Sequence, residues 1–257
     1  MNLDGDNVIG IVGGMGPQAG VALFNSILHH TRATTDQQHL SVMLMSLPKY
    51  ITDRTAFLEG RSKVNPAFSI AEIIKKLEIA GAGVVGIACN TSYCPEIYNT
   101  ITAELYKVNS QVKLVNMPQV TCSYIKKHYP QVRRVGLMTT NGTYRSQVYK
   151  RHLQDLGYEV LLPDNRFQND VIHRMIYDPQ FGIKANPRGV TGEVKLLVDK
   201  TLEFFRAGKA DAIIVGCTDL SLIPTLHTEK DIIVVDAIEA LALELIRQAM
   251  NCQTSIL

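Results

Sequence analysis

The chain has 257 residues, 46% of them hydrophobic, which is enough apolar material for one large α/β unit or for two compact halves. Its 26 lysine and arginine residues against 24 acidic residues give a formal net charge of +2, and no long basic run marks a surface for nucleic acid or anionic membranes. This composition indicates a soluble globular protein whose partner is a small molecule.

Short apolar runs alternate with longer amphipathic segments along the chain, a pattern that indicates repeated β-α units. Most of the runs are rich in Val, Ile and Leu throughout, as is typical of strands buried on both faces. Helical segments such as Ala67–Ala80 and Val194–Arg206 lie between them, so we expect parallel sheets with helices on either side. The predicted strands are Val8–Val12, Val42–Leu47, Val84–Ala88, Lys113–Val115, Val135–Met138, Ala212–Val215 and Ile232–Val235.

Three landmarks of the first half recur in the same order in the second half, each displaced by about half the chain. They pair Gly10 with Gly136, Cys89 with Cys217, and Asn116 with Asp236. Such a repeat indicates an internal duplication. We therefore expect an α/β fold of two pseudo-symmetric domains, each a mostly parallel sheet flanked by helices.

We place the first domain at residues 1–117 plus 236–257, with the first cysteine, and the second at residues 118–235, with the second cysteine. Two similar domains that face one another leave a cleft between them. The expected active site lies in that cleft, because ligand pockets form preferentially at domain interfaces.

Cys89 and Cys217 each follow a predicted strand, at the sheet edge where open α/β folds bind ligands. Predicted helix starts follow both, so amides and the helix dipole are expected to lower the thiol pKa below about 8.5. Equivalent thiols in facing halves would approach a ligand from opposite sides, as inversion of a stereocentre requires. The alternative is that both are small buried hydrophobes, which is common for free cysteine.

The remaining sequence features predict neither a metal site nor a disulfide framework. Cys94, Cys122 and Cys252 lie on predicted helices, away from strand ends and without a repeated partner, and are interpreted as packing or surface residues. Five cysteines are an odd number, and neither a C-x-x-C pair nor H-E-x-x-H occurs.

Met1–Asp6 lacks the pattern of a signal peptide, and no apolar stretch approaches the roughly 18 residues of a membrane span. We expect the protein in the cytoplasm.

Motifs spread over nearly the whole chain resemble those of aspartate racemases of the Asp/Glu/hydantoin racemase superfamily. They are Ile9–Pro17, Asp53–Ala56, Cys89–Thr91, Thr139–Thr143, Tyr177 with Lys184 downstream, and Gly216–Thr218. The resemblance implies two pseudo-symmetric α/β domains, usually a homodimer, and proton transfer at the α-carbon of an acidic amino acid without pyridoxal phosphate or metal.

The resemblance also implies roles for single residues. Cys89 and Cys217 would be the two acid/base residues, while Asn90, Thr91 and Thr218 would hydrogen-bond the carboxylate or amino group of the substrate. Hydroxyls and amides at helix starts suit that task.

Arg54 and Lys184 are similar in position to the cationic pair that holds the side-chain carboxylate, and the resemblance implies that Asp53 and Tyr177 beside them also bind the substrate. The alternatives are a solvated surface pair for Asp53 and Arg54, and a merely solubilising role for Lys184. Two further residues, Met15 and Thr140, are expected to line the pocket through backbone amides.

The chain departs from the family pattern at two places. Asp219 stands where these racemases usually have glutamate, one methylene longer, and the segment between Tyr177 and Lys184 is about three residues longer than usual. We hypothesise that Asp219 orients the second thiol or accepts its proton. The alternative is that Asp219 caps a helix that begins near Leu220.

Rival functions remain open at this stage. The segment Gly14–Ala19 satisfies the dinucleotide pattern G-x-G-x-x-A, but the next strand runs into Pro48 and Lys49 instead of the acidic residue of an NAD site. Lyases and isomerases of the same superfamily act on other carboxylic acids, and glutamate or another amino acid is a further candidate substrate. A non-enzymatic amino-acid-binding module would be signalled by loss of one cysteine, and this chain has both.

Overall fold

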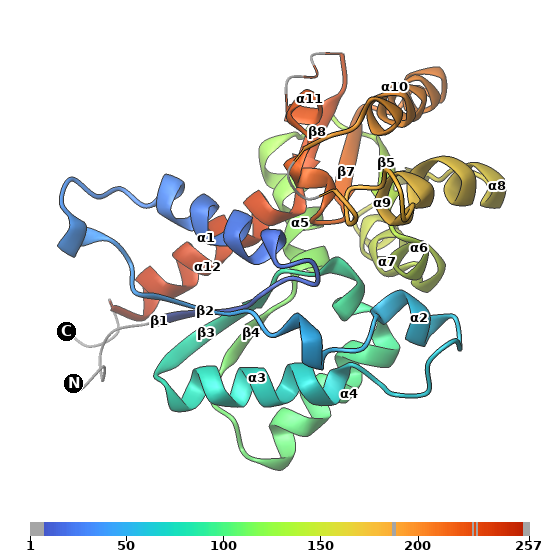
Figure 1. The fold of residues 1–257 in the computed structure, drawn as a ribbon. Coiled ribbons are helices and arrows are strands. Elements are labelled where there is room, and N and C mark those ends of the chain that lie inside the picture. Colours follow the sequence, from blue (N-terminus) through green and yellow to red (C-terminus); the bar gives the residue numbers. More distant parts are fainter. Residues whose placement is uncertain (1–7, 187–188, 228, 230, 254–257) are drawn as a thin grey trace.

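Two four-stranded parallel sheets, one from each half of the chain, form the framework of this computed structural model (Figure 1). The structure describes residues 8–186, 189–227, 229 and 231–253, so the signal-peptide expectation for Met1–Asp6 lies outside the described residues. The strands are β1 (Val8–Val12), β2 (Val42–Met45), β3 (Ala82–Ile87), β4 (Lys113–Val115), β5 (Arg134–Thr139), β6 (Glu159–Leu161), β7 (Ala212–Gly216) and β8 (Ile233–Asp236).

The two sheets have the same topology, because their strand orders are β2-β1-β3-β4 and β6-β5-β7-β8. The repeated glycines stand at equivalent register positions: Gly10 lies between Met43 and Val85, and Gly136 lies between Leu161 and Ile213. This arrangement confirms the predicted α/β fold with two similar parallel sheets. The domain boundaries at 117/118 and 235/236 remain our proposal.

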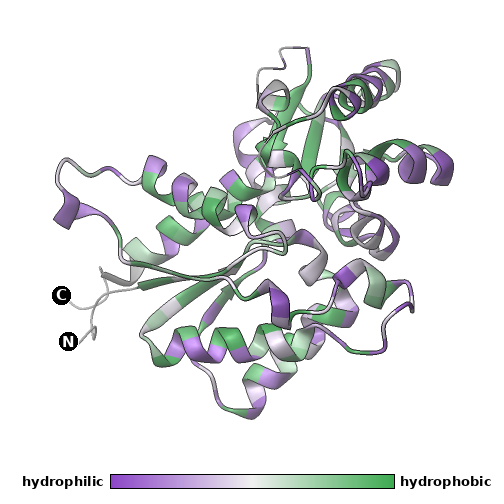
Figure 2. Cartoon of the chain, viewed as in Figure 1, coloured by the Kyte–Doolittle hydropathy of each residue, from purple (hydrophilic) through white to green (hydrophobic). Residues whose placement is uncertain are grey.

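Helices cover both faces of each sheet, with their hydrophobic side turned inward and hydrophilic residues outside (Figure 2). The α-helices are α1 (Gln18–His30), α2 (Arg54–Leu58), α3 (Ala67–Ile79), α4 (Pro95–Lys107), α5 (Met117–His128), α6 (Asn141–Ser146), α7 (Val148–Asp155), α8 (Asn165–Phe167), α9 (Arg174–Tyr177), α10 (Gly192–Ala207), α11 (Pro224–His227) and α12 (Ala237–Gln253). Four 3-10 turns and one π-helix complete the described elements: η1 (Asp36–Gln38), η2 (Pro48–Tyr50), η3 (Asn90–Tyr93), η5 (Leu220–Leu222) and the π-helix η4 (Gln168–His173).

The last helix, α12, returns to the first sheet and packs beside α1 (Figure 1). Gly86 of β3 permits this approach, because a Cβ atom there would lie 2.9 Å from Leu245 and 3.2 Å from Leu241 of α12. Buried residues of α12 belong to the same core as β1 and β3. Two further cores pack on the two sides of the second sheet.

The structure adds one strand and shortens another relative to the sequence prediction. The edge strand β6 has three residues, none of them fully buried, so it carried too little pattern to be found. Strand β2 ends at Met45 instead of Leu47, because Pro48 begins the 3-10 turn η2. Among the described residues, no helix is both long and apolar enough to cross a membrane.

Candidate active site

The two repeated cysteines meet at one pocket between the halves of the chain. Its empty space, part of it open to solvent, is about 240 Å³, and Cys89 and Cys217 lie on its wall just beyond β3 and β7. Of the predicted site residues only Asp53 does not line it. The described lining residues are Met15, Arg54, Cys89, Asn90 and Thr91 from the first half, and Thr140, Tyr177, Lys184, Cys217, Thr218 and Asp219 from the second.

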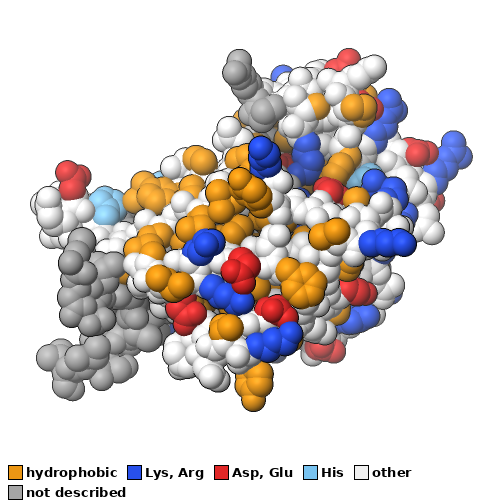
Figure 3. Space-filling model, turned by 60° about the horizontal axis from the view of Figure 1, so that its bottom comes forward, with side chains coloured by type: hydrophobic (Ala, Val, Ile, Leu, Met, Phe, Trp, Pro, Cys, Tyr) orange, Lys and Arg blue, Asp and Glu red, His pale blue; other side chains and the backbone are white. Residues whose placement is uncertain are grey.

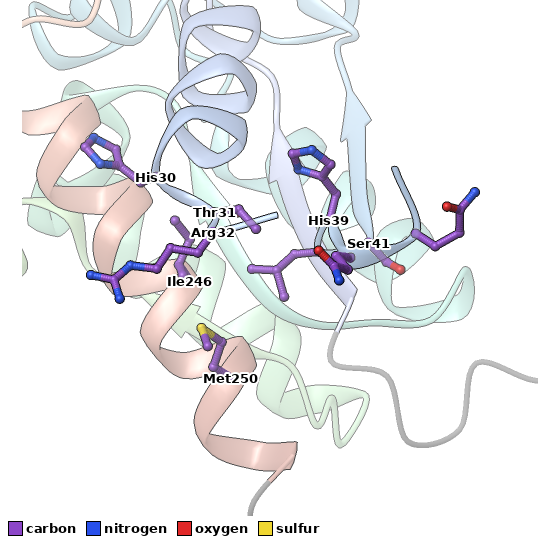
Figure 4. Close-up of a pocket in the computed structure, with 10 residues that line it drawn as sticks. His30, Thr31, Arg32, His39, Ser41, Ile246 and Met250 are labelled. Carbon is purple, nitrogen blue, oxygen red and sulfur yellow. The ribbon is translucent and has the colours of Figure 1, made fainter. Parts of the chain in front are cut away.

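Two larger grooves lie away from the thiols. One, of about 1190 Å³, lies between the end of α1, the segment 31–41 and α12, with His30, Arg32 and His39 on its walls (Figure 4). The other, of about 1540 Å³, lies between β4, α5 and α12. Neither groove has a cysteine among its described lining residues, so both lack the paired groups that the smaller pocket has.

The same backbone hydrogen bond, from the N–H of the third residue onward to the cysteine carbonyl, holds both cysteines. The carbonyl of Cys89 accepts a hydrogen bond from Ser92 N–H at 3.1 Å, and the carbonyl of Cys217 accepts one from Leu220 N–H at 2.9 Å. Cys89 therefore directly precedes the 3-10 turn η3, and Cys217 lies two residues before Asp219, which the turn η5 follows. The helix start predicted after Cys89 is confirmed, because α4 begins at Pro95, beyond η3. Because these turns have only four and three residues, the dipole beside each sulfur is smaller than expected.

The glycine-rich turn after β1 presses directly against the first cysteine strand. A Cβ atom at Gly14 would lie 2.7 Å from the carbonyl oxygen of Ala88 and 2.5 Å from that of Gly16, so only glycine fits. Thr218 Oγ1 donates to the same Ala88 oxygen at 3.4 Å, across the two halves. The glycine motif thus serves close packing beside Cys89, a role that needs no nucleotide.

The surroundings of Cys217 overturn one sequence prediction. Its thiol donates to Asp219 Oδ2 at 3.7 Å. Burial, followed by the negative charge of Asp219, raises the pKa of Cys217 to about 12, where the sequence predicted a lowered pKa. Lys184 acts in the opposite direction with a smaller effect. The physical reason is that loss of water around the sulfur outweighs a short turn and one cation.

Arg54 lies in the pocket wall, with 5% of its surface exposed, and is not part of a solvated surface pair. Asp53 caps α2 by accepting from Ala56 N–H at 2.7 Å, which places Arg54 at the first helical position. The guanidinium donates to the Met15 carbonyl. Burial lowers the pKa of Arg54, but the charges of Cys89, Tyr177 and Asp53 and a hydrogen bond with Cys89 together raise it above its ordinary value.

Lys184 points to the same place from the second half. Its Nζ lies 2.6 Å from Asp219 Oδ2, donates to Met15 O at 2.8 Å, and stands 5.3 Å from the centre of the Tyr177 ring. Lys184 is therefore not a solubilising surface residue. The backbone carbonyl of Met15 accepts hydrogen bonds from both Arg54 and Lys184, because the turn after β1 directs this oxygen toward them. The sequence prediction that Met15 lines the pocket through its backbone amide N–H is therefore wrong.

The longer segment before Lys184 folds back on itself. Ile183 N–H donates to Met175 O at 3.1 Å and Lys184 N–H donates to Ile176 O at 3.2 Å, so the extra residues form a turn outside the pocket. The insertion consequently leaves Lys184 beside Tyr177.

Asp219 does not cap the turn that follows it. Its side chain makes no capping hydrogen bond to η5, and its backbone is in the αR region. The carboxylate instead contacts both Lys184 and the Cys217 thiol, as the hypothesis of a role beside the second thiol requires. The capping alternative is wrong for this geometry.

Hydroxyl and amide groups join the halves across the floor of the pocket. Thr91 Oγ1 lies 3.0 Å from Thr140 Oγ1 and 3.1 Å from Thr143 Oγ1, and Tyr149 Oη donates to Asn90 Oδ1. Thr143 and Tyr149 were not predicted from the sequence. Thr143 stands three residues after the helix cap Thr140, which was a readable signal, whereas Tyr149 had only the pattern of a core aromatic.

Two buried N–H donors at the pocket have no hydrogen-bond partner among the described residues. They are Nε of Arg54 and Nδ2 of Asn90. Buried donors are normally paired, so an unpaired couple on one pocket indicates a ligand that supplies acceptors.

Asp53 and Tyr177 support the cationic wall from behind. Tyr177 Oη donates to Asp53 Oδ2 at 3.2 Å, which ties the segment before Lys184 to the cap of α2. Asp53 therefore holds Arg54 in place through the cap of α2. The sequence predicted that Asp53 contacts the substrate, but Asp53 is not among the described lining residues of the pocket. Among the described residues, no group of three His, Cys, Asp or Glu side chains is arranged to hold a metal ion.

Fold and pocket together define a class: an α/β protein of two similar sheets with one thiol from each half at a shared site. The model of the Asp/Glu/Hydantoin racemase family matches residues 12–245. The chain belongs to this family.

Known relatives agree with this assignment. The chain is 25% identical over 240 residues to the broad specificity amino-acid racemase RacX of Bacillus subtilis (strain 168), covering 91% of this chain and 95% of that protein. The solved structure of Picrophilus torridus aspartate racemase is 27% identical with a TM-score of 0.74, covering 95% of this chain and 94% of that one. An aspartate racemase homologue from Pyrococcus horikoshii OT3, 22% identical with a TM-score of 0.69, shares the fold over 95% of this chain and 99% of its own.

Proposed function

We propose that this protein is a cofactor-independent amino-acid racemase that interconverts L- and D-aspartate, with glutamate as the next substrate. One thiol removes the α-proton from one face of the substrate, and the other delivers a proton to the opposite face. In this scheme Cys89 and Cys217 are the catalytic residues. Asp219 acts on the second thiol through the contact at 3.7 Å.

The observation that carries the proposal is the pair of thiols at equivalent strand ends, both on one small pocket. Cys89 is 6% exposed and Cys217 is 4% exposed, so water has little access to either sulfur. A site that excludes water protects a carbanion-like species from stray protonation. Duplication accounts for the presence of one acid/base group on each side.

The charges around the pocket support an acidic amino acid. Arg54 and Lys184 donate to the same Met15 oxygen, so their positive groups lie close together. A distal carboxylate would take the place of that oxygen, with the free Nε of Arg54 as an additional donor. Thr91, Thr140, Thr218 and the free amide of Asn90 are the candidate partners of the α-carboxylate and amino groups.

A second candidate is a racemase of amino acids with uncharged side chains. Lys184 already forms an ion pair with Asp219 at 2.6 Å, which leaves Arg54 as the main positive charge for a ligand. One cation matches the α-carboxylate of any amino acid. The similarity to RacX, a racemase described as having broad specificity, supports this alternative. The experiment below tests both candidates.

Incubation of the pure protein with single L-amino acids in deuterated water tests the proposal. NMR follows the loss of α-hydrogen signal, and chiral chromatography follows the D-enantiomer. We expect both for aspartate, less for glutamate, and little for alanine. Equal rates for alanine and aspartate would favour the second candidate, and no exchange with any amino acid would refute the racemase proposal.

We also propose a homodimer in the cytoplasm. The exposed hydrophobic side chains of Phe68 and Ile79, both on α3, offer apolar surface for a second copy of the chain. Figure 3 shows hydrophobic side chains grouped on the face that is turned forward. Size-exclusion chromatography with light scattering is expected to give twice the chain mass of 28.5 kDa.

A further inference from the structure

His173 ends the π-helix η4 and touches two walls of the pocket without lining it. Its Nδ1 accepts a hydrogen bond from Asn141 N–H at 3.3 Å. Its ring stacks on Tyr177, with 4.5 Å between the ring centroids and 26° between the planes. A π-helical turn is rare and often occurs at functional sites, since it re-aims the side chains of a helix.

The two partners of His173 belong to opposite sides of the site. Asn141 follows Thr140, whose hydroxyl meets Thr91 on the pocket floor. Tyr177 lies beneath the Lys184 ammonium and donates to Asp53, which caps the helix of Arg54. A movement of the imidazole would therefore shift the threonine floor relative to the cationic wall.

The π-helix is itself anchored to the same strand end. Gln168, at its start, donates to Thr139 O at 2.9 Å and to Asn141 Oδ1 at 3.1 Å. Asn141 Nδ2 in turn donates to Asn169 Oδ1 at 2.7 Å. Asn141 is thus hydrogen-bonded to Gln168, Asn169 and His173, all on η4. These bonds fix His173 relative to α6 while its ring packs on Tyr177.

We propose that His173 is a positioning residue of the site, whose neutral imidazole couples the start of α6 to the Tyr177 ring and so sets the spacing of the two pocket walls. The consequence for turnover rests on the proposed function. The coupling itself does not, because it is a property of the contacts between His173, Asn141 and Tyr177.

The accepting nitrogen requires the neutral ring, because a protonated Nδ1 would present a proton to the Asn141 N–H. Burial lowers the pKa of His173, which keeps the ring neutral further into the acid range. The charged groups that act on it are Glu59 and Asp53, which raise its pKa, and Arg145 and Arg61, which lower it. As pH falls through the pKa of His173, the hydrogen bond is lost and the walls loosen.

Two substitutions separate the roles of the ring and the acceptor. His173→Phe keeps an aromatic ring against Tyr177 but removes the acceptor, while His173→Asn places an amide oxygen near the position of Nδ1. The control is His152→Asn on α7, a half-buried histidine whose pKa burial also lowers. Labelling of single cysteines by iodoacetamide, read by mass spectrometry, reports pocket opening without any substrate.

We expect His173→Phe to speed labelling of Cys89 and Cys217 several-fold, with Cys122 unchanged as the buried internal reference. For the racemase reaction we expect roughly a tenfold fall in kcat/KM, as for an orphaned buried donor, with most of it restored in His173→Asn. Alkylation needs the thiolate and therefore slows at acid pH for every thiol, so labelling of Cys89 and Cys217 is read as a ratio to Cys122. This ratio should rise at acid pH in the wild type and in His152→Asn, and should stay level in His173→Asn.

The labelling results decide the proposal. Wild-type labelling in His173→Phe, or an equal rise at Cys122, would overturn it, since the first means no coupling and the second means general unfolding. If His173→Phe labels faster at Cys89 and Cys217 but the wild-type protein shows no racemase activity, the positioning role of His173 stands and the proposed function is refuted. Faster labelling together with a normal kcat/KM would overturn the catalytic consequence.

Discussion

The two halves place their thiols by the same backbone geometry but surround them with opposite charges. Cys89 faces the buried guanidinium of Arg54, whose pKa it helps to raise. Cys217 faces the carboxylate of Asp219, and burial together with that charge raises the pKa of Cys217 to about 12. The duplicated strands thus fix where the sulfurs stand, while the diverged loops fix the charge beside each. The two proton-transfer steps are therefore expected to differ although the folds match.

The largest effect is expected from removing either thiol. Cys89→Ala and Cys217→Ala should each lower racemisation roughly 10²- to 10⁴-fold, because each removes the proton carrier of one face. The single remaining thiol should still exchange the α-hydrogen of one enantiomer, and the two variants should prefer opposite enantiomers. Proton NMR in deuterated water measures this exchange for L- and D-aspartate separately.

Cys122→Ala is the matched control, because Cys122 is buried in the core of the second sheet away from the pocket. It should keep nearly full activity. A rate above a tenth of wild type in either site variant, about 1.4 kcal/mol of barrier, would contradict the two-base scheme.

Removing the charge beside the first thiol should have the next largest effect. Arg54→Ala is expected to lower kcat/KM for aspartate roughly a hundredfold, since a buried charge-assisted contact of about 2–3 kcal/mol is lost. Alanine turnover should change less if Arg54 binds the distal carboxylate. Arg247→Ala, which breaks an exposed pair with Glu244, is the control and should leave the rate unchanged.

Removing the charge beside the second thiol sharpens the comparison between the halves. Asp219→Asn should lower kcat roughly tenfold, because Lys184 loses a charge-assisted partner. It should also lower the pKa of Cys217, since the Asp219 charge is one of the causes that raise it. If Cys217 must carry a proton to act as the acid, the rate falls as pH rises through that pKa.

The alkaline fall in rate should therefore begin at lower pH in Asp219→Asn than in the wild type. Asp219→Glu should keep the wild-type profile, because the charge remains, and Asp231→Asn, an exposed carboxylate, is the control. An unchanged profile and kcat in Asp219→Asn would remove Asp219 from the mechanism.

The smallest effect is expected from the hydroxyl contacts that join the halves. Thr143→Val removes one hydroxyl from the group formed with Thr91 and Thr140, and should lower kcat/KM about fivefold, or about 1 kcal/mol. Thr201→Val is the matched control, since that hydroxyl donates to Leu197 O within its own helix. A similar loss in both variants would assign the effect to general destabilisation.

Much of this molecule could be predicted from the sequence. The apolar runs found seven of the eight described strands, and the repeat predicted two sheets with equivalent cysteines. The missing strand, β6, has three residues on a sheet edge, where half of the apolar pattern is absent. Local patterns predict strands well because a strand buried on both faces needs apolar residues throughout.

The site was predictable in its members but not in its contacts. Eleven of the predicted residues line one pocket, because motifs at strand ends converge on one sheet edge. The pairing of Lys184 with Asp219, and of Tyr149 with Asn90, joins residues far apart in the chain. No local signal encodes such pairs.

By itself, the sequence determined the two similar sheets, the positions of both thiols and the residues around them, because apolar periodicity and strand-end motifs act locally. Only the tertiary structure decided that the Cys217 pKa is raised, that Met15 serves through its carbonyl, and that Asp219 pairs with Lys184 instead of capping a turn. The physical reason is that pKa values and ion pairs depend on burial and on distances between segments, and these exist only once the two halves of the chain have packed together.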